Sequence, residues 1–166
     1  YNKDAIVINS FSKYFNMTGW RLGWIIATKN IINTVERLSM SLFLCPPTFS
    51  QLIAIKAFDN YDVLNKNVLI YKKNRDLLIN SFEDMGFSEY APPDGAFYLY
   101  IDVSNITDDS KEFAIKLLKE AGVSSTPGKD FDYNLGSRFI RFSYGGSHQE
   151  VFEGAKRIKN WIQTKN

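Results

Sequence analysis

The sequence contains very little of the two residue types that carry thiol and imidazole chemistry. Among its 166 residues there is one cysteine, Cys45, and one histidine, His148. A lone cysteine cannot form an internal disulfide bond, so the chain needs no oxidising compartment, and we expect a cytoplasmic protein. Because one histidine leaves few bases that could activate a thiol, we interpret Cys45 as structural. We predict no metal site.

An excess of charge of one sign and long apolar runs are absent as well. Twenty basic residues oppose eighteen acidic ones, which gives a net charge of +2, and the lysines are scattered along the chain. This balance supports neither a nucleic acid nor a membrane surface as a partner. No apolar run reaches the roughly 18 residues that a membrane-spanning helix needs. The hydrophobic content of 45% instead indicates a globular chain with a substantial core.

The first part of the chain has the pattern of two strands followed by helices. Residues 5–28 predict two strands joined by an irregular connection that contains glycine. Asn30 is expected to cap a helix that stops at the Cys-Pro-Pro sequence of residues 45–47. Thr48 and Gln51 have the spacing of a capping box at the start of the next helix.

A long helix precedes an alternation of strands and helices. Residues 61–85 carry an apolar stripe at helical spacing, which Gly86 ends. The sequence then predicts a strand, a helix capped by Asp109, a second strand, and a helix that opens with a capping box at Ser147 and Glu150. In the second strand, alternation places Ile140 and Phe142 on one face and Arg141 on the other.

The chain begins inside this pattern. Residue 1 is Tyr, and residues 5–8, AIVI, already have the composition of a buried strand. We therefore expect the sequence to be part of a longer protein. An absent targeting signal then says nothing about the whole protein.

Four polar side chains gather at the end of the first strand. Ser10, Ser12 and Lys13 are followed by Arg21 eight residues after the lysine. An amine beside another positive charge loses its proton more readily, and hydroxyls with a guanidinium can hold a phosphate. Pyridoxal phosphate enzymes need this combination of an amine and a phosphate site. From the pattern alone, a loop with a solvated lysine and a surface arginine is the more frequent case, so the spacing by itself does not decide between the two.

The segment NSFSKYFNMTGWRLGWIIA resembles the lysine segment of class I aminotransferases, the fold-type I family of pyridoxal phosphate enzymes. In that family S-x-S-K is followed by G-W-R-x-G, with the same spacing between lysine and arginine. The resemblance extends over essentially the whole chain, which corresponds to the C-terminal part of such an enzyme. Later segments follow in the family's order: PPTFSQLIAIKAF, NRDLL, PPDGAFYLY, GVSSTPGKDF and FIRFSYGGS.

The resemblance implies a role for each candidate residue. Lys13 would form the imine with the cofactor and move the proton at the substrate's alpha carbon. Ser10 and Arg21 would hold the cofactor phosphate, and Ser12 would lend a further hydroxyl. Arg141 would bind the substrate's alpha-carboxylate as a bidentate pair.

Other residues of these segments are interpreted as structural or left open. Phe97 and Tyr98 resemble the stretch at the mouth of the family's active site, and core packing is equally open for them. Trp20 and Trp24 are interpreted as packing residues. Arg138 falls where the family has no fixed charge and is interpreted as a surface residue.

The resemblance also implies a fold and a set of partners. The expected class is α/β, as the C-terminal part of the fold-type I fold. Residues 1–58 would complete the large cofactor-binding domain, 59–85 would form a bridging helix, and 86–166 a small α/β domain. The expected protein is a homodimer acting on an amino acid and a 2-oxo acid, nearest to bacterial enzymes named aspartate aminotransferases.

Two alternatives stay open at this stage. A carbon–sulfur lyase of the same fold would share the lysine segment and the carboxylate-binding arginine. A non-catalytic module would keep the fold alone. The family's acidic partner for the cofactor ring nitrogen lies upstream of this sequence, so the chain by itself is expected to be inactive.

Overall fold

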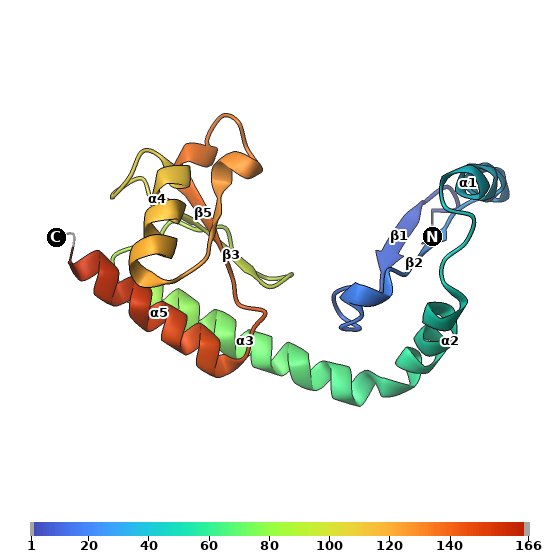
Figure 1. Ribbon diagram of the computed structural model, residues 1–166, viewed down its shortest axis with the longest axis horizontal. Coiled ribbons are helices and arrows are strands. Elements are labelled where there is room, and N and C mark those ends of the chain that lie inside the picture. Colours follow the sequence, from blue (N-terminus) through green and yellow to red (C-terminus); the bar gives the residue numbers. More distant parts are fainter. Residues whose placement is uncertain (1, 165–166) are drawn as a thin grey trace. The chain divides into compact units, whose positions relative to one another are not determined.

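The computed structural model describes residues 2–164 and divides the chain into two compact units, the first ending at Val68 and the second beginning at Leu69. Each unit is described by itself. Helices and strands mix in both, in agreement with the predicted α/β class (Figure 1). The domain limits predicted from the sequence, at 58/59 and 85/86, stay predictions. None of the helices in residues 2–164 has the length and apolarity that crossing a membrane requires.

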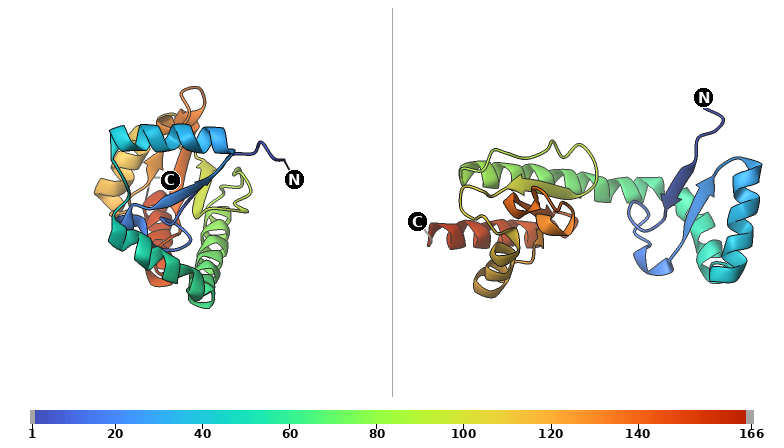
Figure 2. Two further views of the ribbon diagram at one scale, coloured as in Figure 1. Left: turned by 90° about the vertical axis from the view of Figure 1, so that its right-hand side faces the viewer. Right: turned by 90° about the horizontal axis from the view of Figure 1, so that it is seen from above.

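The first unit opens with the expected pair of strands. Strands β1 (Val7–Ser10) and β2 (Gly23–Ile26) pair antiparallel, with Ser10 opposite Gly23. They lie side by side in both views of Figure 2. Helices α1 (Lys29–Leu42) and α2 (Thr48–Ala57) follow, and α3 (Tyr61–Asp84) begins in this unit and ends in the second.

Two predicted helix caps of the first unit are wrong. The N-cap of α1 is Thr28, so Asn30 lies inside the first turn. The N-cap of α2 is Pro47, and Thr48 is already helical, so the predicted capping box is absent. Proline has no side-chain oxygen that could accept a hydrogen bond, so α2 begins without a side-chain cap. The Gln51 amide instead donates a hydrogen bond of 2.9 Å to the carbonyl of Pro46.

Aromatic rings form the core of the first unit. Phe11 is buried, and its ring centroid lies 4.8 Å from that of Phe15, 4.9 Å from Trp24 and 5.5 Å from Phe58. Trp20 packs beside the same cluster. Both tryptophans are therefore packing residues, as predicted.

The second unit contains a three-stranded antiparallel sheet in the order β3-β5-β4. Its strands are β3 (Tyr98–Asp102), β4 (Thr126–Pro127) and β5 (Phe139–Ser143). In the middle strand, Ile140 and Phe142 are buried while Arg141 lies on the opposite face, which confirms the predicted alternation.

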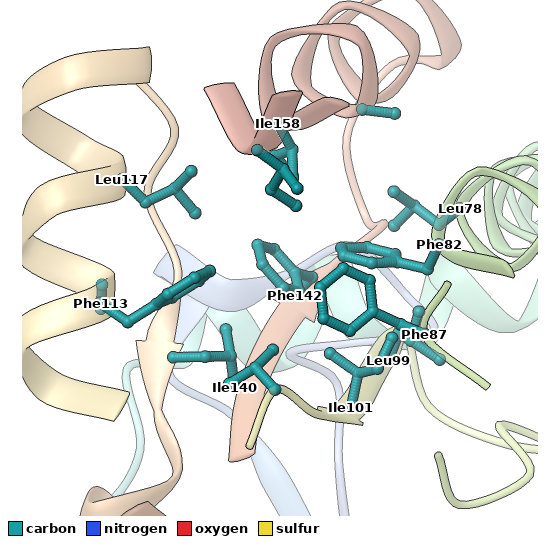
Figure 3. Close-up of a cluster of buried hydrophobic side chains, with 14 of the residues drawn as sticks. Leu78, Phe82, Phe87, Leu99, Ile101, Phe113, Leu117, Ile140, Phe142 and Ile158 are labelled. Atoms are coloured by element: carbon teal, nitrogen blue, oxygen red, sulfur yellow. The ribbon is translucent and has the colours of Figure 1, made fainter. Parts of the chain in front are cut away.

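Three helices cover the buried face of this sheet. They are the second half of α3, α4 (Ser110–Lys116), which continues as a π-helical turn over Leu117–Ala121, and α5 (His148–Gln163). In both figures, α5 runs beside the end of α3. Figure 3 shows side chains from all three helices meeting those of the sheet, among them Leu78, Phe82, Phe113, Leu117, Ile140, Phe142 and Ile158.

The predicted caps of the second unit are confirmed. The carboxylate of Asp109 accepts hydrogen bonds from the backbone N–H groups of Lys111 and Glu112, at 2.9 and 3.2 Å. Ser147 and Glu150 form a complete capping box at the start of α5. These side chains satisfy N–H groups that have no partner within a helix.

A buried asparagine joins α3 to the loop between β5 and α5. The amide nitrogen of Asn74 donates to the carbonyl oxygens of Tyr144 and Gly146, at 3.0 and 2.9 Å. Its amide oxygen lies 2.8 Å from Nδ1 of His148. Because both amide hydrogens are used, this oxygen is the acceptor and the histidine Nδ1 is the donor. Asn74 is fully buried, so each of these bonds replaces water that cannot reach it.

We predict that Asn74→Ala lowers the free energy of unfolding by about 2–3 kcal/mol, because two carbonyl groups and a histidine lose their partner in a buried place. Asn80→Ala, an exposed asparagine on the same helix, is the matched control and should change it by less than about 0.5 kcal/mol. Urea unfolding followed by intrinsic fluorescence measures both. Equal effects of the two variants would contradict a special role for Asn74.

A buried carboxylate at the end of β3 is paired with an exposed arginine. Asp102 forms an ion pair with Arg138 and accepts a hydrogen bond of 2.8 Å from the backbone N–H of Ser104. Burial by itself raises the pKa of Asp102, but the hydrogen bonds from Ser104 and the interaction with Arg138 outweigh it, so the pKa lies below the usual range. Arg138 is a surface residue, as predicted, and it also has this structural partner.

This lowered pKa gives a testable pH dependence. A carboxyl whose pKa is lower in the folded protein stabilises it above the unfolded value of 3.8 and loses that contribution as the pH falls through the folded value. We predict that Asp102→Asn is less stable than the wild type at pH 7 and that the difference narrows below about pH 4. Urea midpoints at pH 7 and pH 3 measure this, with the exposed Asp94→Asn as control. A difference independent of pH would refute the role of the ionised carboxylate.

Candidate active site

The strand pair of the first unit presents the loop that carries Lys13. After β1 ends at Ser10, the N–H of Phe11 still donates to the carbonyl of Leu22, at 3.0 Å, and the chain between them forms a closed loop. The buried side chains of Phe11 and Met17 anchor this loop, and the Met17 N–H donates to the Phe11 carbonyl at 3.1 Å. The buried side chains of Phe11 and Met17 thus hold the loop by packing, while its polar residues face outward.

A chain of hydrogen bonds connects Ser10 to Arg21. The Ser10 hydroxyl accepts from the Ser12 N–H at 3.0 Å, and the Thr18 hydroxyl donates to the Ser12 carbonyl at 2.8 Å. The carbonyl of Thr18 in turn accepts from Nη1 of Arg21 at 3.1 Å. The structure therefore brings Ser10, Ser12 and Arg21 into one network, as the sequence predicts, and adds Thr18 at its centre.

Lys13 lies in a tight turn of this loop. Its carbonyl accepts a hydrogen bond of 3.0 Å from the N–H of Asn16, whose φ of 54° is left-handed. Asparagine tolerates that backbone conformation better than most residues. Lys13 itself is exposed, next to the half-buried Ser12.

The backbone at Arg21 is strained. Its φ of 51° lies in the left-handed region, which costs a residue with a side chain roughly 1–2 kcal/mol. Two residues later, a Cβ added to Gly23 would lie 2.6 Å from the carbonyl oxygen of Asn9, so only glycine fits there. Strain of this kind is maintained where the surrounding structure fixes the backbone, and it is frequent at ligand sites.

The chemistry of this residue set fits an anion with several oxygens. Arg21 supplies a permanent positive charge with donors in a planar fork, and the two serines supply hydroxyl donors. Lys13 adds a primary amine within the same loop. The set therefore suits the phosphate and the aldehyde of pyridoxal phosphate, as the resemblance implied.

Arg141 lies in the second unit, in the middle strand of its sheet. It stands opposite Tyr100 of β3 on one side and opposite Thr126 of β4 on the other. Its Nη2 donates to the Thr126 hydroxyl at 3.2 Å. The guanidinium carbon lies 4.4 Å from the ring centroid of Tyr98 and 4.5 Å from that of Phe131. Tyr98 thus faces this arginine instead of the core.

Three residues that contact a candidate residue, Thr18 in the first unit and Thr126 and Phe131 in the second, were not identified from the sequence. Thr18 follows Met17 in the lysine segment, but a threonine hydroxyl in a loop does not by itself indicate a role in a site. Thr126 and Phe131 both lie in the segment GVSSTPGKDF, which was recognised only as a whole. The contacts of Thr126 and Phe131 with Arg141 form only when the strands pair and the loop closes. The sequence pattern around each residue gives no information about such contacts.

A comparison with protein families decides the classification. The model of the family described as aminotransferase class I and II matches residues 1–158. The chain belongs to this family. The match confirms the resemblance drawn from the lysine segment, and it includes both the loop of Lys13 and the strand of Arg141.

Curated relatives in this family are considerably longer than the chain. The valine–pyruvate aminotransferase of Mycobacterium tuberculosis is 40% identical over 99% of the chain, which covers 43% of that protein. The (5-formylfuran-3-yl)methyl phosphate transaminase of Methanocaldococcus jannaschii is 40% identical over 96% of the chain and 42% of its own length. The chain therefore spans about two fifths of the length of these relatives.

Solved structures of aminotransferases have the same fold over nearly the whole chain. An aminotransferase from Mycobacterium tuberculosis superposes with a TM-score of 0.94 at 41% identity, over 98% of this chain and 43% of that one. An aspartate aminotransferase from Thermotoga maritima gives a TM-score of 0.85 at 30% identity, over 95% and 40%. These matches confirm the predicted fold class, the C-terminal part of an aspartate aminotransferase-like fold.

Proposed function

We propose that the full-length protein containing this chain is a pyridoxal phosphate-dependent aminotransferase, which moves an amino group between an amino acid and a 2-oxo acid. The observation that carries the proposal is the network of Ser10, Ser12, Thr18 and Arg21 around the loop of Lys13. These residues offer hydrogen-bond donors and a positive charge beside an amine in one loop of an aminotransferase-family chain, which supports the proposal.

The residues of the first unit have distinct tasks in this proposal. Ser10, Ser12 and Arg21 hold the cofactor's phosphate, and their hydrogen-bond network fixes them before the ligand arrives, which lowers the entropic cost of binding. The bound cofactor supplies a conjugated ring that delocalises the negative charge left when the substrate's alpha carbon loses a proton. The Nζ of Lys13 takes up and returns that proton.

In the second unit, Arg141 binds the alpha-carboxylate that amino acids and 2-oxo acids have in common. A guanidinium can bind two carboxylate oxygens at once, which fixes orientation as well as position. The transfer has two halves: the amino acid gives up its amino group, and the 2-oxo acid then receives it. Arg141 serves both halves, because donor and acceptor carry the same carboxylate.

Neither alternative from the sequence gains support. The relatives that cover nearly the whole chain are named aminotransferases or transaminases, and none of those described above is named a lyase or a non-catalytic protein. Their printed substrates differ, so the proposal is limited to the class of amino acids and 2-oxo acids.

We further propose a homodimer located in the cytoplasm. Large apolar side chains of the first unit are strongly exposed, with Ile8, Leu42 and Leu44 each 74–78% accessible. Apolar surface of this extent supports contact with further protein. The single, exposed Cys45 supports a reducing compartment.

The role of Lys13 is tested by trapping the cofactor. We expect that the full-length protein, incubated with pyridoxal phosphate and reduced with borohydride, carries the adduct on Lys13 in peptide mass spectrometry. Lys13→Ala should lose the adduct and lower the rate of transamination at least about 100-fold, because a group that transfers a proton contributes at least about this factor to the rate. Lys29→Ala, another exposed lysine, is the control and should keep both. An adduct at another lysine would overturn the assignment.

The role of Arg141 is tested separately from cofactor binding. We expect Arg141→Ala to weaken the apparent affinity for amino acid and 2-oxo acid alike by about 10- to 100-fold, as for the loss of hydrogen bonds to a charged group. The cofactor's absorbance and affinity should not change. Arg157→Ala, an exposed arginine on α5, is the control. Steady-state kinetics with pyruvate and 2-oxoglutarate as acceptors measure the effect, and unchanged substrate affinity would refute it.

A further inference from the structure

Two arginines near β5 are held in different ways. Arg138 precedes the strand and forms an ion pair with the buried carboxylate of Asp102. Arg141 lies within the strand, and no ion pair found in residues 2–164 involves it. Its charge is instead contacted by the rings of Tyr98 and Phe131, with the hydroxyl of Thr126 at one nitrogen.

The way a cation is held determines what it can still bind. A carboxylate partner neutralises a guanidinium and occupies its N–H groups. An aromatic ring attracts the positive charge through its electron-rich face and uses none of those donors. The contacts of Arg141 therefore keep its position fixed while its charge and most of its N–H groups stay available for a carboxylate from outside.

The backbone that carries Phe131 is held by hydrogen bonds, although the side chain is 53% exposed. It follows a 3₁₀ turn at Gly128–Asp130, and its N–H donates to the Gly128 carbonyl at 2.9 Å. The end of the same loop is fixed by the fully buried Ser110, whose hydroxyl donates to the Gly136 carbonyl at 2.8 Å. These bonds hold the loop backbone at both ends, and the Phe131 ring contacts the Arg141 guanidinium from it.

We propose that Tyr98 and Phe131 form an aromatic clamp that positions the guanidinium of Arg141 for the carboxylate of the substrate. Phe131 is then a positioning residue that acts through Arg141. The inference rests on the proposed function, because that function assigns the carboxylate to Arg141. Its consequence is specific: removing the ring weakens ligands that carry a carboxylate and leaves matched ligands without one unchanged.

The test compares two amines with the full-length protein loaded with pyridoxal phosphate. L-Valine carries an alpha-carboxylate, and isobutylamine is the same amine without it. Single-turnover absorbance changes give the apparent dissociation constant and the maximal rate for each. We expect Phe131→Leu to raise the dissociation constant of L-valine about 3- to 20-fold, the range of cation–π contacts, with the maximal rate changed less than about twofold. For isobutylamine both values should stay the same.

Three further variants separate positioning from general damage. Phe131→Tyr keeps a ring and should remain within about twofold of the wild type. Tyr133→Leu removes a fully exposed aromatic residue two positions later in the same loop and should have no effect. In the Arg141→Ala background, Phe131→Leu should add little, because the cation on which the ring acts is absent.

A calorimetric titration with isovalerate, which has a carboxylate and no amine, distinguishes failure of the clamp from failure of the proposed function. If neither L-valine nor any other protein amino acid reacts, but isovalerate binds and Phe131→Leu weakens its binding, the clamp is supported while the activity is not. If L-valine reacts and Phe131→Leu leaves both it and isovalerate unchanged, the clamp is overturned and the activity stands. An equal loss for L-valine and isobutylamine overturns the clamp as well.

Discussion

The alternation of strand β5 connects the core of the second unit to its candidate site. Ile140 and Phe142 are buried against the three covering helices, so the register of the strand is fixed by their burial. A shift by one residue would bring the charge of Arg141 into the core and move both apolar side chains out of it. The position of the arginine is therefore stabilised by the same free energy that stabilises the core.

A similar relation holds in the first unit, where packing supports a polar loop. Phe11 and Met17 bury their side chains on either side of Lys13, so the loop is held at two points. Between them, the network through Thr18 joins residues that are separated in sequence. In both units, then, a polar side chain projects from a backbone segment whose apolar neighbours are buried: Lys13 in the first unit and Arg141 in the second. Groups held in this way lose less freedom when a ligand binds, which favours binding.

The parts of the fold that could be predicted are those that depend on local periodicity. The strand alternation around Arg141 and the caps at Asp109 and Ser147 follow from side chains and backbone groups a few residues apart. The predicted box at Thr48 is wrong because the N-cap is Pro47, one residue earlier, and proline has no side-chain oxygen that could accept a hydrogen bond. The roles of Ser10, Ser12, Lys13 and Arg21 follow from the resemblance of the lysine segment, and that of Arg141 from the segment FIRFSYGGS. The residue pattern by itself left a solvated loop open. The contacts of Asn74 and Phe131 could not be predicted from the sequence, because they join elements that come together only when the chain folds.

At Arg21, the left-handed backbone and the need for a positive charge favour different residues. Glycine would relieve the strain, and asparagine would tolerate it, but neither carries a positive charge. Selection for a more stable loop and selection for the proposed phosphate binding therefore favour different residues there. A variant of this chain chosen only for thermal stability would tend to lose its arginine, so stability screens are a poor guide at residue 21.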